Sequence, residues 1–308
     1  MTPTEASHKP IDFKRVLIAT DFSEPSRNAL RYATAIARHY GARLYIVHVV
    51  SSVGYKMAGP DAEVQAAELA AHELKALWDK SGASNQQPAV ELQLVVRRGC
   101  VWDELEDLIR HEHVDLVVLG TRGRTGLSKV MLGSVAEETF RKVSCPVLTV
   151  GPISPWDWPQ REVGAEKAIL LATDFGDASI RALPYAVSIA NRSGSRLILL
   201  HVAKFISDGG QVSYSGGTLT SVQEEIRETS IQRLKQLAPM DLTLEPEFRV
   251  TFSLPVDGIL SAATSTAAGL IVLGVHHANL LVPSGHLPSA TAYGVVIGAK
   301  CPVLTVRS

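Results

Sequence analysis

The stretch GTRGRTGLSKVMLGS, residues 120–134, has the composition of a loop that can bind phosphate. It starts at the last residue of an apolar run, VDLVVLG, and ends at Ser134, where a helical pattern begins. Glycines at 120, 123 and 133 allow main-chain amides to approach an anion without interference from a Cβ atom. The predicted helix adds free N–H groups and the positive end of its dipole. The spacing therefore predicts a phosphate-binding loop.

Other readings of the same residues stay open. The loop is not a Walker A motif, because G-x4-G-K-[ST] is absent, and it follows the wrong strand for a dinucleotide fingerprint. Ser134 and Glu137 form the pattern S-x-x-E, so Ser134 could cap its helix through a capping box. Arg122 on an exposed loop is more often a solvated charge than a ligand contact. Asp21, in ATDFS, could simply cap the helix that follows it.

The composition is that of an ordinary globular protein. The 308 residues are 46% hydrophobic and 20% charged, and 30 basic against 31 acidic residues leave a net charge of −1. This balance predicts no bulk attraction to nucleic acid or to a membrane. We expect a cytoplasmic protein, since we find no signal-peptide pattern and no disulfide or metal spacing among the three cysteines.

The chain contains two copies of one unit. RVLIATDFSEPSRNALRYA matches KAILLATDFGDASIRALPYA, VDLVVLG matches AGLIVLG, and CPVLTV occurs in both halves. A proline-containing segment of mixed polarity separates the copies. We therefore expect a domain over 12–151, a linker over 152–166 and a second domain over 167–308.

Each copy alternates strands and helices. In the first copy the pattern predicts strands near 14–20, 43–50, 91–97, 114–119 and 146–150, and helices near 24–40, 62–80, 101–112 and 134–143. Five apolar strands with intervening helices indicate an α/β fold, an open parallel sheet with helices on both faces. If the strand order is 3-2-1-4-5, Asp21 and Gly120 meet at the carboxyl edge of neighbouring strands.

These residues carry a specific resemblance. The signature G-x2-G-x9-G-[S/T], met by Gly120, Gly123, Gly133 and Ser134, is similar to that of the ATP-binding branch of the universal stress proteins. The chain resembles a tandem member of that family, which implies an adenine nucleotide alpha hydrolase-like fold in each half. The resemblance further implies that Ala19 lines the base pocket and that Asp21 and Val49 contact adenosine. It implies that the ribose and phosphates lie against the loop, at Gly120, Gly123, Gly133, Ser134 and Val135. Arg122 would add positive charge beside the phosphates.

The second copy departs from this pattern. Asp174 and Gly274 match Asp21 and Gly120, but His277 replaces Gly123. Depending on the gap chosen, Pro288–Ser289 or Ser289–Ala290 stand in place of Gly133–Ser134. An imidazole obstructs close main-chain approach, and proline removes an amide donor. We expect a weak or absent ATP site in this half.

Three functions are compatible with the sequence. The first is a stress-response regulatory protein that binds ATP, with or without Mg²⁺, and presents the ordered loop to a partner whose identity the sequence does not reveal. The second is a slow ATP hydrolase or nucleotide-transferring enzyme, although no catalytic grouping accompanies the loop. The third is an assembly scaffold with an incidental ligand. The CPVLTV segments predict edge strands, so we expect an intrachain pseudo-dimer and a homodimer of whole chains.

Overall fold

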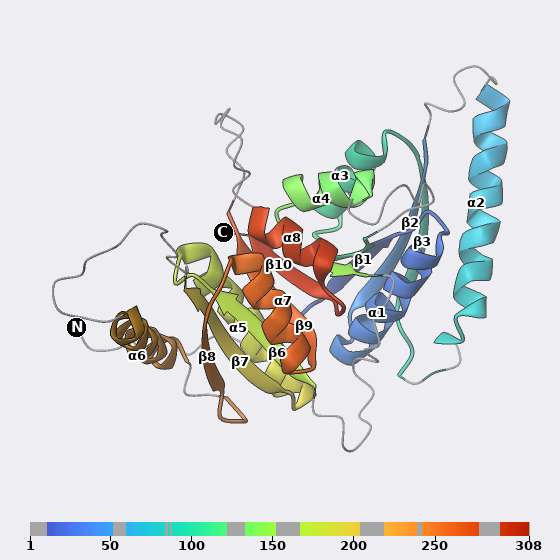
Figure 1. Cartoon of the computed structure of the whole chain (residues 1–308). Coiled ribbons are helices and arrows are strands. Elements are labelled where there is room, and N and C mark those ends of the chain that lie inside the picture. Colours follow the sequence, from blue (N-terminus) through green and yellow to red (C-terminus); the bar gives the residue numbers. More distant parts are fainter. Residues whose placement is uncertain are drawn as a thin grey trace. The chain divides into compact units, whose positions relative to one another are not determined.

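The computed structural model describes residues 11–51, 60–83, 86, 88–121, 133–151, 167–203, 219–238, 242–276 and 290–307. The chain divides into two compact units, one holding β1–β5 with α1–α4 and the other holding β6–β9 with α5–α8 (Figure 1). The proposed linker, the Arg122–Gly123 pair and the second-copy residues His277, Pro288 and Ser289 lie outside the described residues. None of the described helices combines the length and apolar character needed to cross a lipid bilayer.

The first unit has the alternation that the sequence predicts. Its elements are β1 (Arg15–Ala19), α1 (Glu24–Tyr40), β2 (Arg43–Ser51), α2 (Pro60–Lys80), β3 (Leu92–Gly99), α3 (Val101–His111), β4 (Leu116–Gly120), α4 (Ser134–Lys142) and β5 (Val147–Val150). The predicted boundaries agree with these to within about two residues.

The second half repeats the same series. Its elements are β6 (Ala168–Thr173), α5 (Asp177–Ser193), β7 (Arg196–Ala203), α6 (Leu219–Leu237), β8 (Glu247–Phe252), α7 (Pro255–Ser265), β9 (Ala268–Val275), α8 (Ala290–Gly298) and β10 (Val303–Arg307).

The strand order confirms the predicted topology in each half. The order is β3-β2-β1-β4-β5 in the first and β8-β7-β6-β9-β10 in the second. Ile18 of β1 lies between Ile46 of β2 and Val118 of β4, and all of these strands are parallel. Strands β2 and β3 therefore lie on one side of β1, and β4 and β5 on the other. Open α/β sheets bind ligands at the carboxyl ends of the two strands where the order changes side, here β1 and β4.

Helices cover both faces of the first sheet. α1 packs against β1 and β4, α2 packs against β2 and β3, and α3 lies beside α4 (Figure 1). Val16, Leu17 and Ile18 of β1 have 0% exposure, as expected for a central strand with both faces covered. This packing explains why the strands are almost continuously apolar.

Helix α1 begins and ends where its sequence predicts. The Ser23 side chain caps the N-terminus by accepting the Ser26 N–H, and Pro25 lies in the first turn. Gly41 takes the left-handed conformation at the C-terminus, with φ of 63°, and the Ala42 N–H donates to the Ala37 carbonyl at 2.8 Å. These two caps fix the length of the helix and hence the turn that precedes it.

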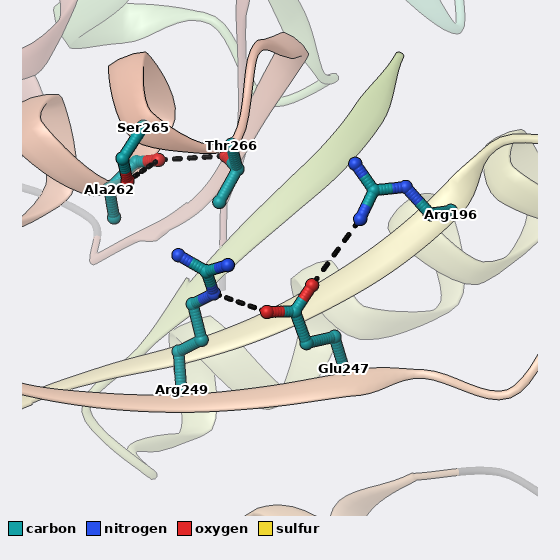
Figure 2. Close-up of polar contacts among 6 residues, drawn as sticks. All are labelled: Arg196, Glu247, Arg249, Ala262, Ser265 and Thr266. Carbon is teal, nitrogen blue, oxygen red and sulfur yellow. Dashed lines mark hydrogen bonds and ion pairs between the residues drawn. The ribbon is translucent and has the colours of Figure 1, made fainter. Parts of the chain in front are cut away.

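Polar side chains form ion pairs and hydrogen bonds at the amino edge of the second sheet, the edge opposite the carboxyl ends of its strands. Figure 2 shows Glu247, at the start of β8, between Arg196 of β7 and Arg249, with 3.4 Å separating Arg196 Nη1 from Glu247 Oε2. At the end of α7, the Ser265 and Thr266 hydroxyls both donate to the Ala262 carbonyl, at 3.1 and 2.7 Å. Half-exposed ion pairs of this kind contribute about 0–1 kcal/mol each.

Asp115 ties β4 to β1 at the amino edge of the first sheet. Its Oδ2 accepts the Lys14 N–H at 2.7 Å and its Oδ1 accepts the Arg15 N–H at 3.1 Å. Burial raises the pKa of the Asp115 carboxyl, and the two main-chain donors offset only part of that rise.

We expect the difference in free energy of unfolding between the wild type and Asp115→Asn to depend on pH. The pKa of Asp115 in the folded protein lies above its ordinary value of 3.8, so the stabilising contribution of this group is complete below that pH. The contribution is lost as the pH rises through the folded-state pKa. Urea unfolding of both proteins between acidic and neutral pH measures this, with the exposed Asp61→Asn as control. A difference that grows in favour of the wild type as the pH rises would contradict the assignment.

Candidate functional site

Four of the predicted residues meet at the carboxyl edge of the first sheet. Ala19 is the last residue of β1 and Gly120 the last of β4, and these strands are neighbours. Val49 lies on β2, two residues beyond the partner of Ala19. Asp21 follows β1 directly, and all four residues are half-buried. The strand order thus brings together residues that are a hundred positions apart in the chain.

Asp21 occupies a tight turn between β1 and α1. Its Oδ1 accepts the Ser23 N–H at 3.1 Å and the Ser23 hydroxyl at 2.5 Å. Ser23, and not Asp21, is the N-cap of α1, so the reading of Asp21 as the cap is wrong. Asp21 instead orients the side chain of the N-cap Ser23, which lies two positions later in the chain.

Gly120 has a packing role that the sequence analysis missed. A Cβ atom at this position would lie 2.8 Å from both the carbonyl carbon and the carbonyl oxygen of Pro25, in the first turn of α1. At Gly274, the matching position, a Cβ would lie 2.1 Å from the Ala178 carbonyl group of α5. Glycine at the end of this strand therefore allows the helix to pack closely, whether or not phosphate binds. Glycine recurs at position 274 in the second half, which lacks the rest of the phosphate-binding motif. This recurrence could have predicted the packing role from the sequence.

The two ends of the glycine loop are joined at its base. The Gly133 N–H donates to the Thr121 carbonyl at 3.0 Å, and the Thr121 N–H donates to Val150 of β5 at 3.0 Å. The bond between Gly133 and Thr121 places the start of α4 beside the end of β4. The intervening residues 122–132, with Arg122 and Gly123, lie outside the described part of the chain.

The capping box predicted at Ser134 is not formed. Gly133 is the N-cap of α4 and Ser134 is already the first helical residue; the Glu137 N–H donates to the Gly133 carbonyl at 2.8 Å. A glycine N-cap has no side chain to accept a hydrogen bond from the first turn. The N-cap position therefore supplies no side-chain acceptor to the N–H groups of that turn, such as that of Val135.

The second half reproduces the turn after its first strand. The Asp174 carboxylate accepts the Gly176 N–H at 2.9 Å and the Ser179 hydroxyl at 2.9 Å. Desolvation alone would raise the pKa of Asp174, but these two donors and the nearby His276 lower it below its ordinary value. The Asp174 carboxylate is thus held by two donors, like that of Asp21, although its serine donor comes from a different position.

A histidine on the second strand of each half supports this turn. His48 Nδ1 lies 2.8 Å from the Thr20 carbonyl oxygen, and His201 Nδ1 lies 2.9 Å from that of Thr173. Core packing is the usual reading of a histidine on a buried strand. Both histidines lie 28 residues after the threonine of the T-D-F tripeptide, and this shared spacing is the signal in the sequence that could have found them.

No metal-binding group is evident in the described part of the chain, where no three histidine, cysteine, aspartate or glutamate side chains converge. The exposed Cys100, the half-buried Cys145 and the buried Cys301, all within the described residues, form no disulfide bond.

Comparison with known proteins identifies the family. The model of the universal stress protein family matches residues 12–151 and again residues 166–307, and the chain belongs to this family, with two such domains in tandem. A universal stress protein of Mycolicibacterium smegmatis is 27% identical over 300 residues, covering 95% of this chain and 96% of the relative. Universal stress protein MJ0531 of Methanocaldococcus jannaschii is 31% identical over 141 residues, 45% of this chain and 82% of the relative. The crystal structure of a universal stress protein from Archaeoglobus fulgidus, 19% identical, superposes with a TM-score of 0.66 over 95% of this chain and 98% of that one, which shows the shared fold.

Substitution of the strand-end glycines tests their packing role without a ligand. We expect Gly120→Ala and Gly274→Ala each to lower the free energy of unfolding of their own domain by about 1–3 kcal/mol, because the helix must move away. Gly274→Ala should cost more, since its Cβ would approach to 2.1 Å and not 2.8 Å. Thermal or urea unfolding without nucleotide measures both. Unchanged stability in Gly120→Ala would show that glycine is not required there for packing.

Proposed function

We propose that the first domain binds an adenine nucleotide, ATP, at the carboxyl edge between β1 and β4. The observation that carries this proposal is the bond from the Gly133 N–H to the Thr121 carbonyl. It joins both ends of the glycine motif at the edge where Asp21 lies. The start of α4, whose N-cap is a glycine, then offers N–H donors and a positive dipole end to phosphate.

Different residues contact different parts of the nucleotide in this proposal. Ala19 lines the base pocket, while the Asp21 carboxylate and the main chain at Val49 contact the adenosine. Phosphates and ribose lie against the loop and the start of α4, at Gly120, Arg122, Gly123, Gly133, Ser134 and Val135. Support for this division comes from the family signature and from the convergence of the described members at one edge.

We propose that Mg²⁺ binds together with the nucleotide phosphates and is not held by the protein before the nucleotide binds. Mg²⁺ keeps several waters and is commonly held by one or two carboxylates together with phosphate oxygens. Asp21 is the carboxylate beside the loop, and its Oδ1 already accepts two hydrogen bonds from Ser23. This donor set fits a metal–nucleotide complex better than a preformed metal site.

The biological role follows from binding. We infer a cytoplasmic stress-response regulator in which nucleotide favours one conformation of loop 122–132 and a partner protein recognises it. A ligand shifts such an equilibrium only by its differential affinity for the two conformations. The domains extend over 12–151 and 167–308, with 152–166 as linker, and the second domain binds ATP weakly or not at all.

Assembly through the CPVLTV strands is a separate part of the proposal. β5 carries this sequence in the first domain and pairs with β4 on one side. A parallel sheet that ends in an apolar strand favours further pairing. We propose that the two copies pair within a chain through these strands. A homodimer of whole chains is a further part of the proposal, which sedimentation equilibrium of the full chain measures.

Binding of ATP should depend on Asp21 and not on Asp174. Loss of a carboxylate that hydrogen-bonds the ligand should weaken binding about tenfold, whereas Asp174→Ala removes the matching group from a domain without the glycine motif. Isothermal titration calorimetry with ATP and magnesium on the wild type, Asp21→Ala and Asp174→Ala measures this. No heat with the wild type, or loss of binding only in Asp174→Ala, would contradict the proposal.

Hydrolysis is the alternative function, and it predicts a different result. Turnover of ATP well above the buffer rate, abolished by Asp21→Ala, would identify an enzyme. We expect phosphate release by the wild type to stay close to background, because the described residues place no evident general base beside the loop. A phosphate-release assay with both proteins at equal saturation with ATP separates the two functions.

A further inference from the structure

The turn that presents Asp21 has an unfavourable backbone conformation. Phe22, the next residue, has φ of 63°, in the left-handed region that residues with a Cβ atom seldom adopt. Such a conformation costs about 1–3 kcal/mol and persists only where the surroundings hold it. The direction of the Asp21 side chain depends on this turn, because the two residues share a peptide unit.

Thr20, which precedes Asp21, forms hydrogen bonds through its N–H, its hydroxyl and its carbonyl. Its N–H donates to the Val47 carbonyl at 2.8 Å, and its hydroxyl accepts the Phe22 N–H at 3.0 Å. The same hydroxyl lies 3.0 Å from the Ser26 hydroxyl. The Thr20 carbonyl oxygen lies 2.8 Å from His48 Nδ1. A carbonyl can only accept, so Nδ1 carries the proton and the imidazole is the donor.

His48 also packs against the strained residue. The rings of His48 and Phe22 have centroids 4.5 Å apart and planes inclined by 34°. One side chain from β2 therefore contacts the turn on both sides of Asp21: through a hydrogen bond to the residue before it and through ring packing with the residue after it. This double contact opposes relaxation of Phe22 to a negative φ.

We propose that His48 is a positioning residue for nucleotide binding, which acts by holding the Thr20–Phe22 turn so that the Asp21 carboxylate faces the ligand. This inference rests on the proposed ATP site. His48 itself need not touch the nucleotide. Its contribution is to affinity, because a turn that is already held does not have to be ordered when the ligand binds.

The second domain supplies a matched control. There Phe175 has φ of 64°, His201 Nδ1 lies 2.9 Å from the Thr173 carbonyl oxygen, and the two rings are 4.5 Å apart. The same substitution at His201 therefore removes the same interactions from a turn outside the proposed ATP site. A purely structural role predicts equal effects at the two positions, and a positioning role predicts an effect on ATP affinity at His48 alone.

The experiment uses three variants of the full chain. His48→Phe keeps a ring against Phe22 but removes the donor to Thr20. His48→Asn keeps a donor at nearly the same place, since its amide nitrogen occupies a position close to that of Nδ1. His201→Phe is the control. ATP affinity is measured by calorimetry, and the hydrogen-exchange rates of the Phe22 and Phe175 amides are measured by NMR on nucleotide-free protein.

We expect His48→Phe to weaken ATP binding about fivefold to tenfold and to speed exchange at Phe22 by a similar factor. His48→Asn should restore most of the affinity. His201→Phe should speed exchange at Phe175 and leave ATP affinity within about twofold of the wild type. Equal ATP affinity in the wild type and His48→Phe, or no effect of His48→Phe on exchange at Phe22, would overturn the inference.

The two proposals fail in different ways. Absence of ATP binding by the wild type refutes the proposed function and, with it, a role of His48 in affinity. ATP binding by the wild type that is insensitive to His48→Phe refutes the positioning role alone. Equal loss of affinity in His48→Phe and His201→Phe also refutes it, because such a loss would come from general destabilisation.

Discussion

The hydrogen-bonded pairing of β1 with β4 is the constraint on which the candidate site depends. Because these parallel strands are neighbours, their carboxyl ends meet at one edge, although Asp21 and Gly120 are far apart in sequence. The same pairing brings the first turn of α1 against the end of β4 so closely that a side chain at Gly120 would overlap Pro25. The Gly133–Thr121 bond then places the start of α4 at this edge. Loop, turn and helix start are thus positioned by one strand pair.

Much of the fold could be predicted from the sequence because its signals are local. Continuous apolar strands and the helix predicted over 24–40 depend on residues that are close together in the sequence, and the structure agrees with both predictions. The repeat supplied a second, independent copy of every element. The 3-2-1-4-5 order, which the sequence analysis assumed for an open parallel sheet, is found in both halves.

The errors and omissions concern side chains whose role depends on distant partners. Ser134 fits a capping box by spacing, yet the helix begins one residue earlier than that box requires, and Gly133 is the N-cap. Gly120 looked like part of a phosphate loop, whereas its contact with Pro25 arises only when α1 folds back on β4. The hydrogen bond of His48 to the Thr20 carbonyl depends on a partner beyond the end of another strand, and the periodicity of the sequence reports burial and not hydrogen bonding. Two of these roles recur in the second half, at Gly274 and His201, which separates features of the fold from features of the nucleotide motif.

The central claim is that ATP binds the first domain at the edge between β1 and β4, and an NMR titration of the isotope-labelled full chain tests it directly. The account predicts that ATP with magnesium shifts the main-chain amide signals of Thr121, Gly133, Val135 and Val49, while those of Phe175, Gly176 and Gly274 stay in place. Shifts confined to the second domain, or no shift of the amides at the start of α4 at saturating ATP, would contradict it.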